Sequence, residues 1–287
     1  MSLPDRPLRI AVPNKGSLSQ AATDILRESG YRQRSDSKEL ALVDSENDVE
    51  FFYLRPRDIA LYVGEGTLDV GITGRDLLLD SGAKAEEVLP LGFGRSRFHF
   101  AAPPGVATSV QDLAGKRIAT SYTGIVQTFL DTHGIQAEVV RLDGAVETSV
   151  QLGVADVIAD VVETGSTLLN AGLEVFGEPI LESEAVLVTR AGIERPAGFT
   201  VFQRRIEGVL VARSYVMMDY DIPAEQVEQA VALTPGIESP TVSPLHREGW
   251  FAVRSMVRRD DAQRVMDALY DLGARGILST DIHACRL

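Results

Sequence analysis

The feature of this sequence that most constrains its fold is a buried strand followed by a turn of small residues and then by a helix. Residues 154–169 read VADVIADVVETGSTLL. The first part is an apolar run with acidic interruptions, which is typical of a buried strand in a parallel sheet. A Thr-Gly-Ser-Thr turn follows, and the apolar residues after it predict a helix. Such a junction directs several backbone N–H groups to one point, where an anion binds.

The side chains at this junction suit a phosphorylated sugar. Gly165 and the hydroxyls of the turn let a phosphate approach the backbone. Asp160, at the end of the strand, offers an acceptor to sugar hydroxyls or to a magnesium ion. We therefore hypothesise a cradle for a 5-phosphoribosyl group. The alternative is an ordinary helix start, because Ser and Thr are common N-cap residues.

A similar pattern occurs earlier in the chain. Residues 66–74 (GTLDVGITG) show the same order of Gly, Asp-Val, strand and Thr-Gly as residues 153–165, and a helix is expected after each. The offset from Gly66 to Gly153 is 87 residues. We interpret the two copies as parts of two similarly built α/β lobes.

The first residues of the chain predict a second anion site. Residues 8–12 read as a buried strand, and a helix is expected from Ser17 to a stop at Gly30. Lys15 and Gly16 therefore stand directly before a helix N-terminus, where the helix dipole favours negative charge. The alternative is a solvated lysine in a turn.

Two arginines follow the next strand. Residues 49–54 predict a strand, and Pro56 suits the first turn of a helix that runs to Val63. Arg55 and Arg57 stand at the end of the strand, where α/β sheets bind their ligands.

The second lobe alternates between strands and helices in the same way. Strands are predicted over residues 97–102, 116–120 and 138–142, and helices over 125–133 and from Asp143 onward. A strand over 184–189 is expected to cross back to the first lobe, and residues 190–200, which contain Gly and Pro, predict a linker.

The pattern changes after this linker. Strands are predicted over residues 208–218, 241–245, 250–257 and 277–282. One helix is expected over 222–233 with Asp221 as N-cap, and another from Asp260 to Gly273. The order βαββαβ is that of a ferredoxin-like module. Such a module serves as an amino-acid sensor, an oligomerisation unit or plain structure, and the fold alone does not choose among them.

Composition disfavours several partners. The net charge of −13 disfavours nonspecific binding to nucleic acid or to anionic membranes. No apolar run approaches the ~20 residues of a membrane helix, and no signal segment is apparent, so we expect a cytoplasmic protein. The single cysteine, Cys285, excludes an internal disulfide, and the four histidines show no metal-ligand spacing.

Seven blocks of sequence, taken in order, resemble the long form of ATP phosphoribosyltransferase, the first enzyme of histidine biosynthesis. They are AVPNKG (11–16), LRPRDI (54–59), DVGITG (69–74), GKRIATSY (115–122), DGAVE (143–147), the junction at 154–168 and LTPGIESPT (233–241). The resemblance extends from about residue 8 to the C-terminus.

The resemblance implies an α/β fold with two periplasmic-binding-protein-like lobes of type II and a C-terminal ferredoxin-like (ACT-like) βαββαβ regulatory domain. We expect lobe I to comprise residues 1–96 and about 187–207, lobe II residues 97–186, and the regulatory domain residues 208–287. The resemblance also implies feedback inhibition by histidine, homo-oligomers that shift between dimer and hexamer, and no separate regulatory subunit.

The reaction implied by the resemblance is a pentosyl transfer that joins ATP to phosphoribosyl pyrophosphate in the presence of Mg²⁺ and releases pyrophosphate. The adenine N1 attacks the anomeric carbon and carries no proton, so we expect no dedicated general base. Positioning and electrostatics should supply most of the catalysis. The sequence accordingly shows no Ser-His-Asp or Cys-His pattern.

The resemblance assigns the phosphoribosyl group to the junction. The 5-phosphate is expected at Glu163, Thr164, Gly165, Ser166 and Thr167. Asp160 is expected to bind the ribose hydroxyls or magnesium, together with Glu147. Phosphoribosyltransferases of the commoner type carry two adjacent acids before their Thr-Gly, whereas Val161 and Val162 stand here. The identity of the second carboxylate on the ribose therefore stays open.

The resemblance assigns the other ligands to three further sets of residues. The catalytic cations that face the pyrophosphate or triphosphate are expected to be Lys15, Arg55 and Arg57. Lys15 and Arg55 are expected to contact the nucleotide together with Gly16, Asp76 and Tyr122. The positions near the histidine pocket of the regulatory domain are Asp221, Ile237 and Thr241.

Three of these residues have a structural alternative, and the whole protein has a competing function. Arg57 pairs with Asp58 or Asp69 on the surface, Glu147 is a first-turn helix acid, or Tyr122 is simply buried. The competing class of protein is a cytoplasmic solute sensor on the same two-lobed fold. The cluster of cations favours a polyphosphate ligand over a neutral solute.

Overall fold

The computed structural model describes residues 6–162 and 166–286. The chain forms two compact units. The first unit contains the residues up to 24 together with 32–198, and the second contains 25–31 together with the residues from 199 onward. Helix α1 (Ser17–Glu28) contributes to both units.

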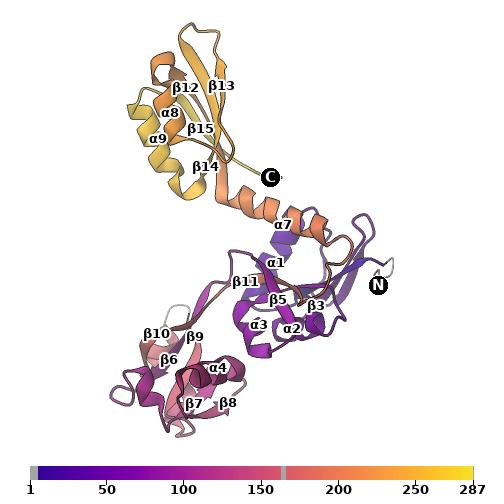
Figure 1. Ribbon diagram of the computed structural model, residues 1–287, viewed down its shortest axis with the longest axis vertical. Helices are drawn as coiled ribbons and strands as arrows, with labels where there is room; N and C mark the ends of the chain where they lie inside the picture. Colours follow the sequence, from indigo (N-terminus) through magenta and orange to yellow (C-terminus); the bar gives the residue numbers. More distant parts are fainter. Residues whose placement is uncertain (1–5, 163–165, 287) are drawn as a thin grey trace. The chain divides into compact units, whose positions relative to one another are not determined.

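The first sheet has six strands in the order β2-β3-β1-β4-β11-β5. These are β1 (Leu8–Pro13), β2 (Ala41–Asp44), β3 (Val49–Leu54), β4 (Val70–Gly74), β5 (Ala85–Pro90) and β11 (Ala185–Arg190). Strand β1 is parallel to β3 and β4, whereas β11 is antiparallel to β4 and β5. The predicted return of residues 184–189 to the first sheet is therefore confirmed (Figure 1).

Two helices pack closely on this sheet. They are α2 (Pro56–Gly64) and α3 (Arg75–Ser81). Ile59 and Val63 of α2 meet Val186 and Val188 of β11 in a buried core. A Cβ atom on Gly71 in β4 would overlap Ile59 Cγ2, so the strand needs a glycine where the helix lies against it.

The second sheet has five strands in the order β10-β6-β9-β7-β8. These are β6 (Ser96–Ala102), β7 (Arg117–Thr120), β8 (Glu138–Arg141), β9 (Val157–Val162) and β10 (Glu174–Ser183). Strand β7 is parallel to β8 and β9. Strand β6 is antiparallel to both of its neighbours, β9 and β10.

Both sheets follow one plan. In each, a first strand (β1 or β7) lies between two parallel neighbours, and an antiparallel strand (β11 or β6) and an edge strand (β5 or β10) complete the sheet. Edge strand β2 is an addition to this plan in the first sheet. The prediction of two similarly built lobes of the type II periplasmic-binding-protein kind is confirmed.

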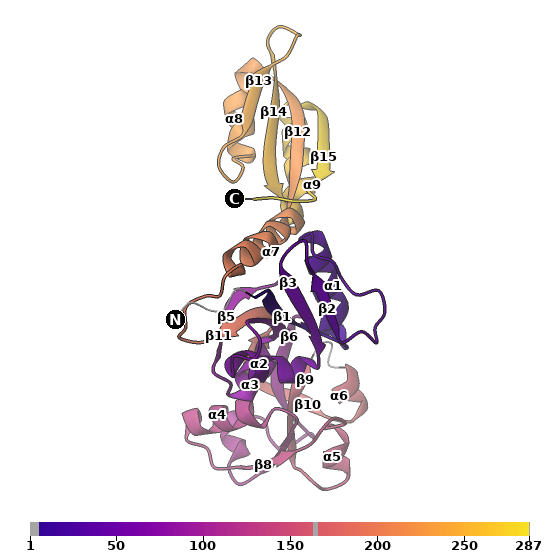
Figure 2. The same cartoon turned by 90° about the vertical axis from the view of Figure 1, so that its right-hand side faces the viewer.

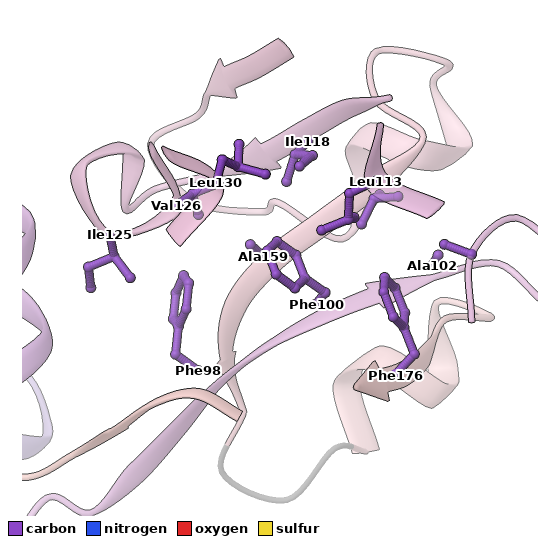
Figure 3. Close-up of a cluster of buried hydrophobic side chains, with 12 residues drawn as sticks. Phe98, Phe100, Ala102, Leu113, Ile118, Ile125, Val126, Leu130, Ala159 and Phe176 are labelled. Carbon is purple, nitrogen blue, oxygen red and sulfur yellow. The ribbon is translucent and has the colours of Figure 1, made fainter. Parts of the chain in front are cut away.

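Helices cover both faces of the second sheet. They are α4 (Thr123–His133), α5 (Thr148–Gln151) and α6 (Ser166–Asn170), with a 3₁₀ turn, η1 (Val110–Leu113), before β7. Phe100 and Ala159 face α4 in one core, as Figure 3 shows, whereas Ala101 and Ile158 face the core of α5 and α6. Helix α4 and the pair α5 and α6 accordingly lie on opposite sides of the sheet (Figure 2).

The second unit begins with α7 (Phe199–Ser214). Its side chains pack against residues 25–31, which comprise the end of α1 and the residues after it. The Phe202 ring lies 5.3 Å from that of Tyr31 between centroids, and Arg213 donates two hydrogen bonds of 2.8 Å to Glu28.

The prediction of a strand over residues 208–218 is wrong. Residues 208–214 complete α7, and strand β12 (Tyr215–Pro223) begins only after them. The run Gly208–Ala212 is short and apolar, and such a run does not distinguish a buried strand from one end of a buried helix. The domain limit expected at residue 208 consequently falls inside a helix.

The remainder of the second unit is a four-stranded antiparallel sheet in the order β13-β14-β12-β15. Its elements are β12, α8 (Val227–Leu233), β13 (Thr241–Pro244), β14 (Trp250–Arg258), α9 (Ala262–Asp271) and β15 (Arg275–Asp281), with 3₁₀ turns η2 (Ala224–Gln226) and η3 (Arg259–Asp261). Figure 1 shows α8 and α9 on one face of this sheet. The predicted βαββαβ order is confirmed.

Two helix starts in this module differ from their predicted positions. Asp221 is not an N-cap, because it lies inside β12 and pairs with Ala252. Pro223 ends that strand, and α8 begins at Val227. Asp260 lies in η3, and Asp261 is the residue before α9.

Within the described ranges 6–162 and 166–286, no helix combines the length and the apolar character that crossing a membrane requires.

Candidate active site

Strands from both sheets of the first unit end around one cavity of about 180 Å³. Lys15 and Gly16 reach it from the loop after β1, and Asp76 from the helix after β4. Tyr122 reaches it from the loop after β7. Four residues that were predicted to contact the nucleotide therefore line the same cavity. The other lining residues are Ser17, Leu18, Pro56, Gly74, Leu77, Gly94, Ser96 and Val161.

Asp76 is fixed in this cavity by hydrogen bonds. Its side chain is buried, and its Oδ1 accepts a hydrogen bond of 2.9 Å from the Ser183 hydroxyl. The same hydroxyl accepts a hydrogen bond of 3.0 Å from the Asp76 backbone N–H. A Cβ atom on Gly74 would overlap Asp76 Oδ1, so the glycine of the Thr-Gly pair makes room for this carboxylate.

Tyr122 places a phenol beside that carboxylate. Its ring packs edge-on against Phe98, with 5.2 Å between the centroids. Burial raises the pKa of the Tyr122 hydroxyl, the charge of Asp76 raises it further, and Arg57 opposes both effects. The hydroxyl is therefore neutral at physiological pH, and Tyr122 lines the cavity.

Arg57 makes an ion pair that the sequence did not suggest. Its Nη1 lies 2.7 Å from Oδ2 of Asp80 in α3, and its Cζ lies 4.9 Å from the centre of the Tyr122 ring. The alternative of a pair with Asp58 or Asp69 is wrong, since Asp69 pairs with Arg6. The Arg57 side chain nevertheless stays 43% exposed.

The other two predicted cations are exposed. Lys15 lines the cavity beside Gly16, whose φ of +82° is the left-handed conformation that favours glycine. Arg55 precedes α2 and, within the described residues, makes no side-chain hydrogen bond to the start of that helix. The cavity thus includes Lys15, whereas its described lining does not include Arg55.

Asp160 has a carboxylate neighbour. It lies near the C-terminal end of β9, half-buried, and its Oδ1 accepts a hydrogen bond of 2.8 Å from the Val161 backbone N–H. Burial raises the pKa of Asp160, that hydrogen bond opposes the rise, and the charge of Glu147 adds to it. Glu147 is the residue that precedes α5, so its alternative role as a helix-start acid and its predicted place near Asp160 are compatible.

The predicted phosphate loop is only partly visible. Glu163, Thr164 and Gly165 lie outside the described residues. Ser166 and Thr167 form the first turn of α6, so a helix follows the junction as predicted. The placement of the 5-phosphate therefore stays a prediction from the sequence.

His99 lies directly across from Asp160 and was not singled out in the sequence. The two residues are partners in the antiparallel pair of β6 and β9, which places their side chains on the same face. Burial lowers the pKa of His99, and the charge of Arg97 lowers it further. His99 Nδ1 is buried and has no hydrogen-bond partner among the residues that the structure describes.

A second, wider cavity of about 470 Å³ contains three arginines. Arg75, Arg95 and Arg97 line it together with Ser96, Val162, Glu182, Ser183 and Glu184. Arg75 donates two hydrogen bonds to Glu87, of 2.8 and 2.7 Å, and Arg97 lies 3.2 Å from Glu182. The signal in the sequence was Gly94-Arg95-Ser96-Arg97, a pair of cations beside a glycine.

Two of the three predicted histidine-pocket residues, Asp221 and Thr241, lie on the face of the C-terminal sheet that α8 and α9 do not cover. Along β12 the buried residues alternate with Asp219 and Asp221, and Asp219 pairs with Arg254. Thr241 in β13 lies opposite Arg254, so it shares this open face with Asp221. Ile237 is half-buried in the loop that leads to β13.

Hydrogen bonds to two side chains of the sheet hold the start of that loop. Thr234 is fully buried, and its hydroxyl lies 2.7 Å from the Tyr220 hydroxyl in the core under the sheet. Ser255 donates a hydrogen bond of 2.8 Å to the Thr234 carbonyl. Two side chains of the sheet therefore hold the start of the loop that carries Ile237.

Comparison with known proteins assigns the family. Residues 55–208 match the sequence model of the family "HisG: ATP phosphoribosyltransferase", and residues 212–284 match "HisG, C-terminal domain". An ATP phosphoribosyltransferase of Streptomyces avermitilis is 67% identical over 98% of this chain and 100% of its own length. One from Streptomyces coelicolor is 66% identical with the same coverage.

A solved structure supports the same assignment. It is described as the "ATP phosphoribosyl transferase (HisG:HisZ) complex from Thermotoga maritima", and it is 26% identical with a TM-score of 0.60. The similarity covers 70% of this chain and 96% of that chain. The order of the sequence blocks, the paired sheets and these relatives agree, and the chain belongs to the ATP phosphoribosyltransferase family.

Proposed function

We propose that this enzyme transfers the 5-phosphoribosyl group of phosphoribosyl pyrophosphate to N1 of ATP, with release of pyrophosphate, as the first step of histidine biosynthesis. The observation that carries the proposal is the shared cavity, which Lys15 and Asp76 line from the first sheet and Tyr122 from the second. Asp160, whose charge acts on Tyr122, lies near the C-terminal end of the neighbouring strand β9. The transfer needs two substrates in line, and residues from two sheets at one cavity suit that need.

The described side chains fit a reaction without a general base. The purine N1 has a lone pair and no proton to lose, so the enzyme needs to align N1 with the anomeric carbon and to stabilise the departing pyrophosphate. Lys15 offers an exposed ammonium for this charge. Tyr122, which is neutral, is a hydrogen-bond donor for the nucleotide, and Asp76 is an acceptor fixed by Ser183.

Asp160 and Glu147 are the proposed carboxylates for the ribose hydroxyls. Burial and the charge of Glu147 both raise the pKa of Asp160, which supports a role for these two acids at one ligand. Hydroxyl donors or a cation would relieve that repulsion on binding. The 5-phosphate then lies at residues 163–167, as the order of strand, turn and helix predicts.

Magnesium fits these residues as a substrate-bound ion. Mg²⁺ keeps several waters and binds through one or two carboxylates plus substrate phosphates. Asp160 and Glu147 provide such carboxylates, and the described residues contain no group of three or more His, Cys, Asp or Glu that would hold a metal alone. When bound, the ion would neutralise pyrophosphate charge, and Asp160 would hold it against the ribose.

The wider cavity offers a place for the remaining phosphates. Arg75 and Arg97 pair with glutamates, and the exposed Arg95 supplies the positive charge that these pairs leave over. Ser96 lines both cavities, so a nucleotide in the first can extend its phosphates toward Arg95 and Arg97. We therefore assign the excess positive charge to substrate phosphates.

We propose that the C-terminal module binds histidine and transmits inhibition. Asp221 and Thr241 share the open face of its sheet, and Asp221 offers a carboxylate to an α-amino or imidazolium group. The solved relative is described as a HisG:HisZ complex. In this chain the C-terminal domain follows the catalytic part directly, so we expect it to work without a separate regulatory subunit, in homo-oligomers that include dimer and hexamer. With phosphorylated metabolites as substrates, we place the reaction in the cytoplasm.

The test of the reaction uses the purified full chain with ATP, phosphoribosyl pyrophosphate and Mg²⁺. We expect release of pyrophosphate and a product with the mass of phosphoribosyl-ATP. 1-Deaza-ATP, which lacks the N1 lone pair, should give no product, whereas 7-deaza-ATP should react. Product from 1-deaza-ATP would place the new bond elsewhere, and no pyrophosphate release from the folded chain would refute the proposal.

The test of the regulatory site uses Asp221→Asn. Loss of a charged hydrogen bond should raise the histidine concentration needed for half inhibition by about tenfold or more. Asp260→Asn is the matched control, since Asp260 lies in η3 away from the open face. Equal inhibition of the Asp221 variant and the wild type would remove histidine from this face.

A further inference from the structure

The free backbone N–H groups at the start of helix α4 donate hydrogen bonds to a residue from another part of the fold. The first N–H groups of a helix have no partners within it, and a local Ser, Thr, Asp or Asn usually accepts from them. Here Tyr122 occupies the N-cap position, and in the described chain its side chain makes no capping hydrogen bond. The nearby Ser121 hydroxyl instead accepts a hydrogen bond of 3.3 Å from Gly144.

Asp80 takes the place of the local cap. Its Oδ1 accepts a hydrogen bond of 2.8 Å from the Gly124 N–H and one of 3.4 Å from the Ile125 N–H. Asp80 belongs to α3, which packs on the first sheet, whereas α4 packs on the second. A carboxylate at this end of a helix is also favoured by the helix dipole.

The second oxygen of the same carboxylate holds Arg57. Oδ2 of Asp80 lies 2.7 Å from Arg57 Nη1, and the Asp80 side chain is only 9% exposed. Arg57 in turn lies over the ring of Tyr122. The Asp80 carboxylate of α3 therefore contacts both Arg57 of α2 and the start of α4, next to Tyr122.

The backbones of α3 and α4 also touch at this point. A Cβ atom on Gly124 would lie 2.5 Å from the main-chain oxygen of Asp80, which is closer than Cβ atoms come to other atoms. Gly124 is thus required by the approach of the two helices, while Asp80 supplies the attraction.

We propose that Asp80 and Gly124 form a clasp between the two sheets, in which Asp80 is a positioning residue for the transfer reaction. By holding the start of α4, the clasp fixes the distance of Tyr122 and Asp160 on the second sheet from Lys15 and Asp76 on the first. Opening it leaves each half of the site intact and misaligns the halves. A misalignment of that kind slows chemistry more than it weakens binding of either substrate.

The first experiment measures the distance between the sheets directly and does not depend on the reaction. Spin labels are introduced at two exposed positions of the full chain, Val43→Cys on β2 of the first sheet and Leu152→Cys directly after α5, which packs on the second sheet, together with Cys285→Ser. We expect a narrow distance distribution in the parent and a broad one after Asp80→Ala or Gly124→Ala. An unchanged distribution in both variants would overturn the clasp.

The second experiment measures steady-state kinetics of the same variants. We expect kcat to fall about tenfold or more in Asp80→Ala, with less than about threefold change in the KM of either substrate. Asp80→Asn keeps an acceptor for Gly124 and loses the charge opposite Arg57, so its loss should be smaller. A rise in KM with unchanged kcat would make Asp80 a binding residue instead of a positioning residue.

Asp112→Ala is the matched control. Asp112 also accepts from backbone N–H groups, those of Thr108 and Ser109, at the start of the turn η1 on the second sheet. Its loss should lower the melting temperature without broadening the distances or lowering kcat. If Asp112→Ala reproduced the Asp80 phenotype, general destabilisation would explain both, and the proposal would fail. The kinetic arm rests on the proposed reaction, whereas the distance arm does not.

Discussion

The two ends of strand β9 carry aspartates with opposite environments. Asp156 precedes the strand and receives hydrogen bonds from the Arg117 guanidinium and backbone N–H, which lower the pKa of Asp156 to about 2. Asp160 lies inside the strand near its C-terminal end, where burial and the charge of Glu147 raise its pKa. The surroundings of Asp156 therefore favour its charged form, whereas those of Asp160 disfavour it.

The two environments suggest different roles, a structural one for Asp156 and a ligand-binding one for Asp160. Asp156 forms an ion pair with Arg117 and so connects the start of β9 to β7. Ion pairs of this kind are common on protein surfaces. Asp160 has Glu147 as a neighbour of like charge, and the Val161 backbone N–H and the charge of Arg57 offset the rise in its pKa only in part. Sites arranged for a ligand often hold charges that the ligand, not the protein, neutralises.

The largest expected effect is that of Asp160→Asn. If Asp160 binds the ribose as proposed, loss of its charge should lower kcat/KM by about 100-fold. Because folding keeps Asp160 in a place that disfavours its charge, the amide should also raise the melting temperature, by about 2 °C. The measurements are steady-state kinetics and thermal unfolding. Lower stability together with normal activity would contradict the assignment of Asp160 to function.

The next effect is that of Glu147→Gln. Removing the neighbouring charge should lower the pKa of Asp160 toward its ordinary range, which NMR titration of the carboxyl carbons would show. We expect kcat/KM to fall about fivefold, because a polar side chain remains to meet the ribose. An unchanged pKa of Asp160 in this variant would show that the charge of Glu147 does not act on Asp160.

The smallest effect on activity is expected for Asp156→Asn. Its pKa is lowered from 3.8 to about 2, so its stabilising contribution is complete above the ordinary value and is lost as the pH falls toward 2. The variant should lose about 2–4 °C in melting temperature near neutral pH and less at pH 3. Its kcat/KM should stay within about twofold of the wild type. A larger loss of activity would make both ends of β9 functional.

The parts of the fold that the sequence predicted are those with strong periodicity. The strands at the centre of each sheet were found because they are apolar and end in recognisable turns, such as Gly74. Strands β2, β5 and β10 were missed, since they are edge strands with mixed polarity, and β10 contains a register shift. The end of α7 was predicted as a strand because Val209–Ala212 carries no helical period.

The site residues divide in the same way. Lys15 and Gly16 were found because they follow a strand and precede a helix, whereas Asp76 and Tyr122 were assigned through the family resemblance. All four line one cavity. Asp80 was missed, because nothing in its sequence context shows that it faces a helix start 44 residues later. Contacts of this kind depend on how two sheets meet, which local patterns do not encode.

The return of β11 to the first sheet has a consequence for synthesis of the chain. Strand β5 borders only β11 among the described strands, and β11 comes after the whole second sheet in the sequence. A chain that leaves the ribosome can therefore close the second sheet while the first still has an unpaired strand. A pause or a truncation before residue 185 would leave that edge exposed, and the nascent enzyme is then most vulnerable to aggregation.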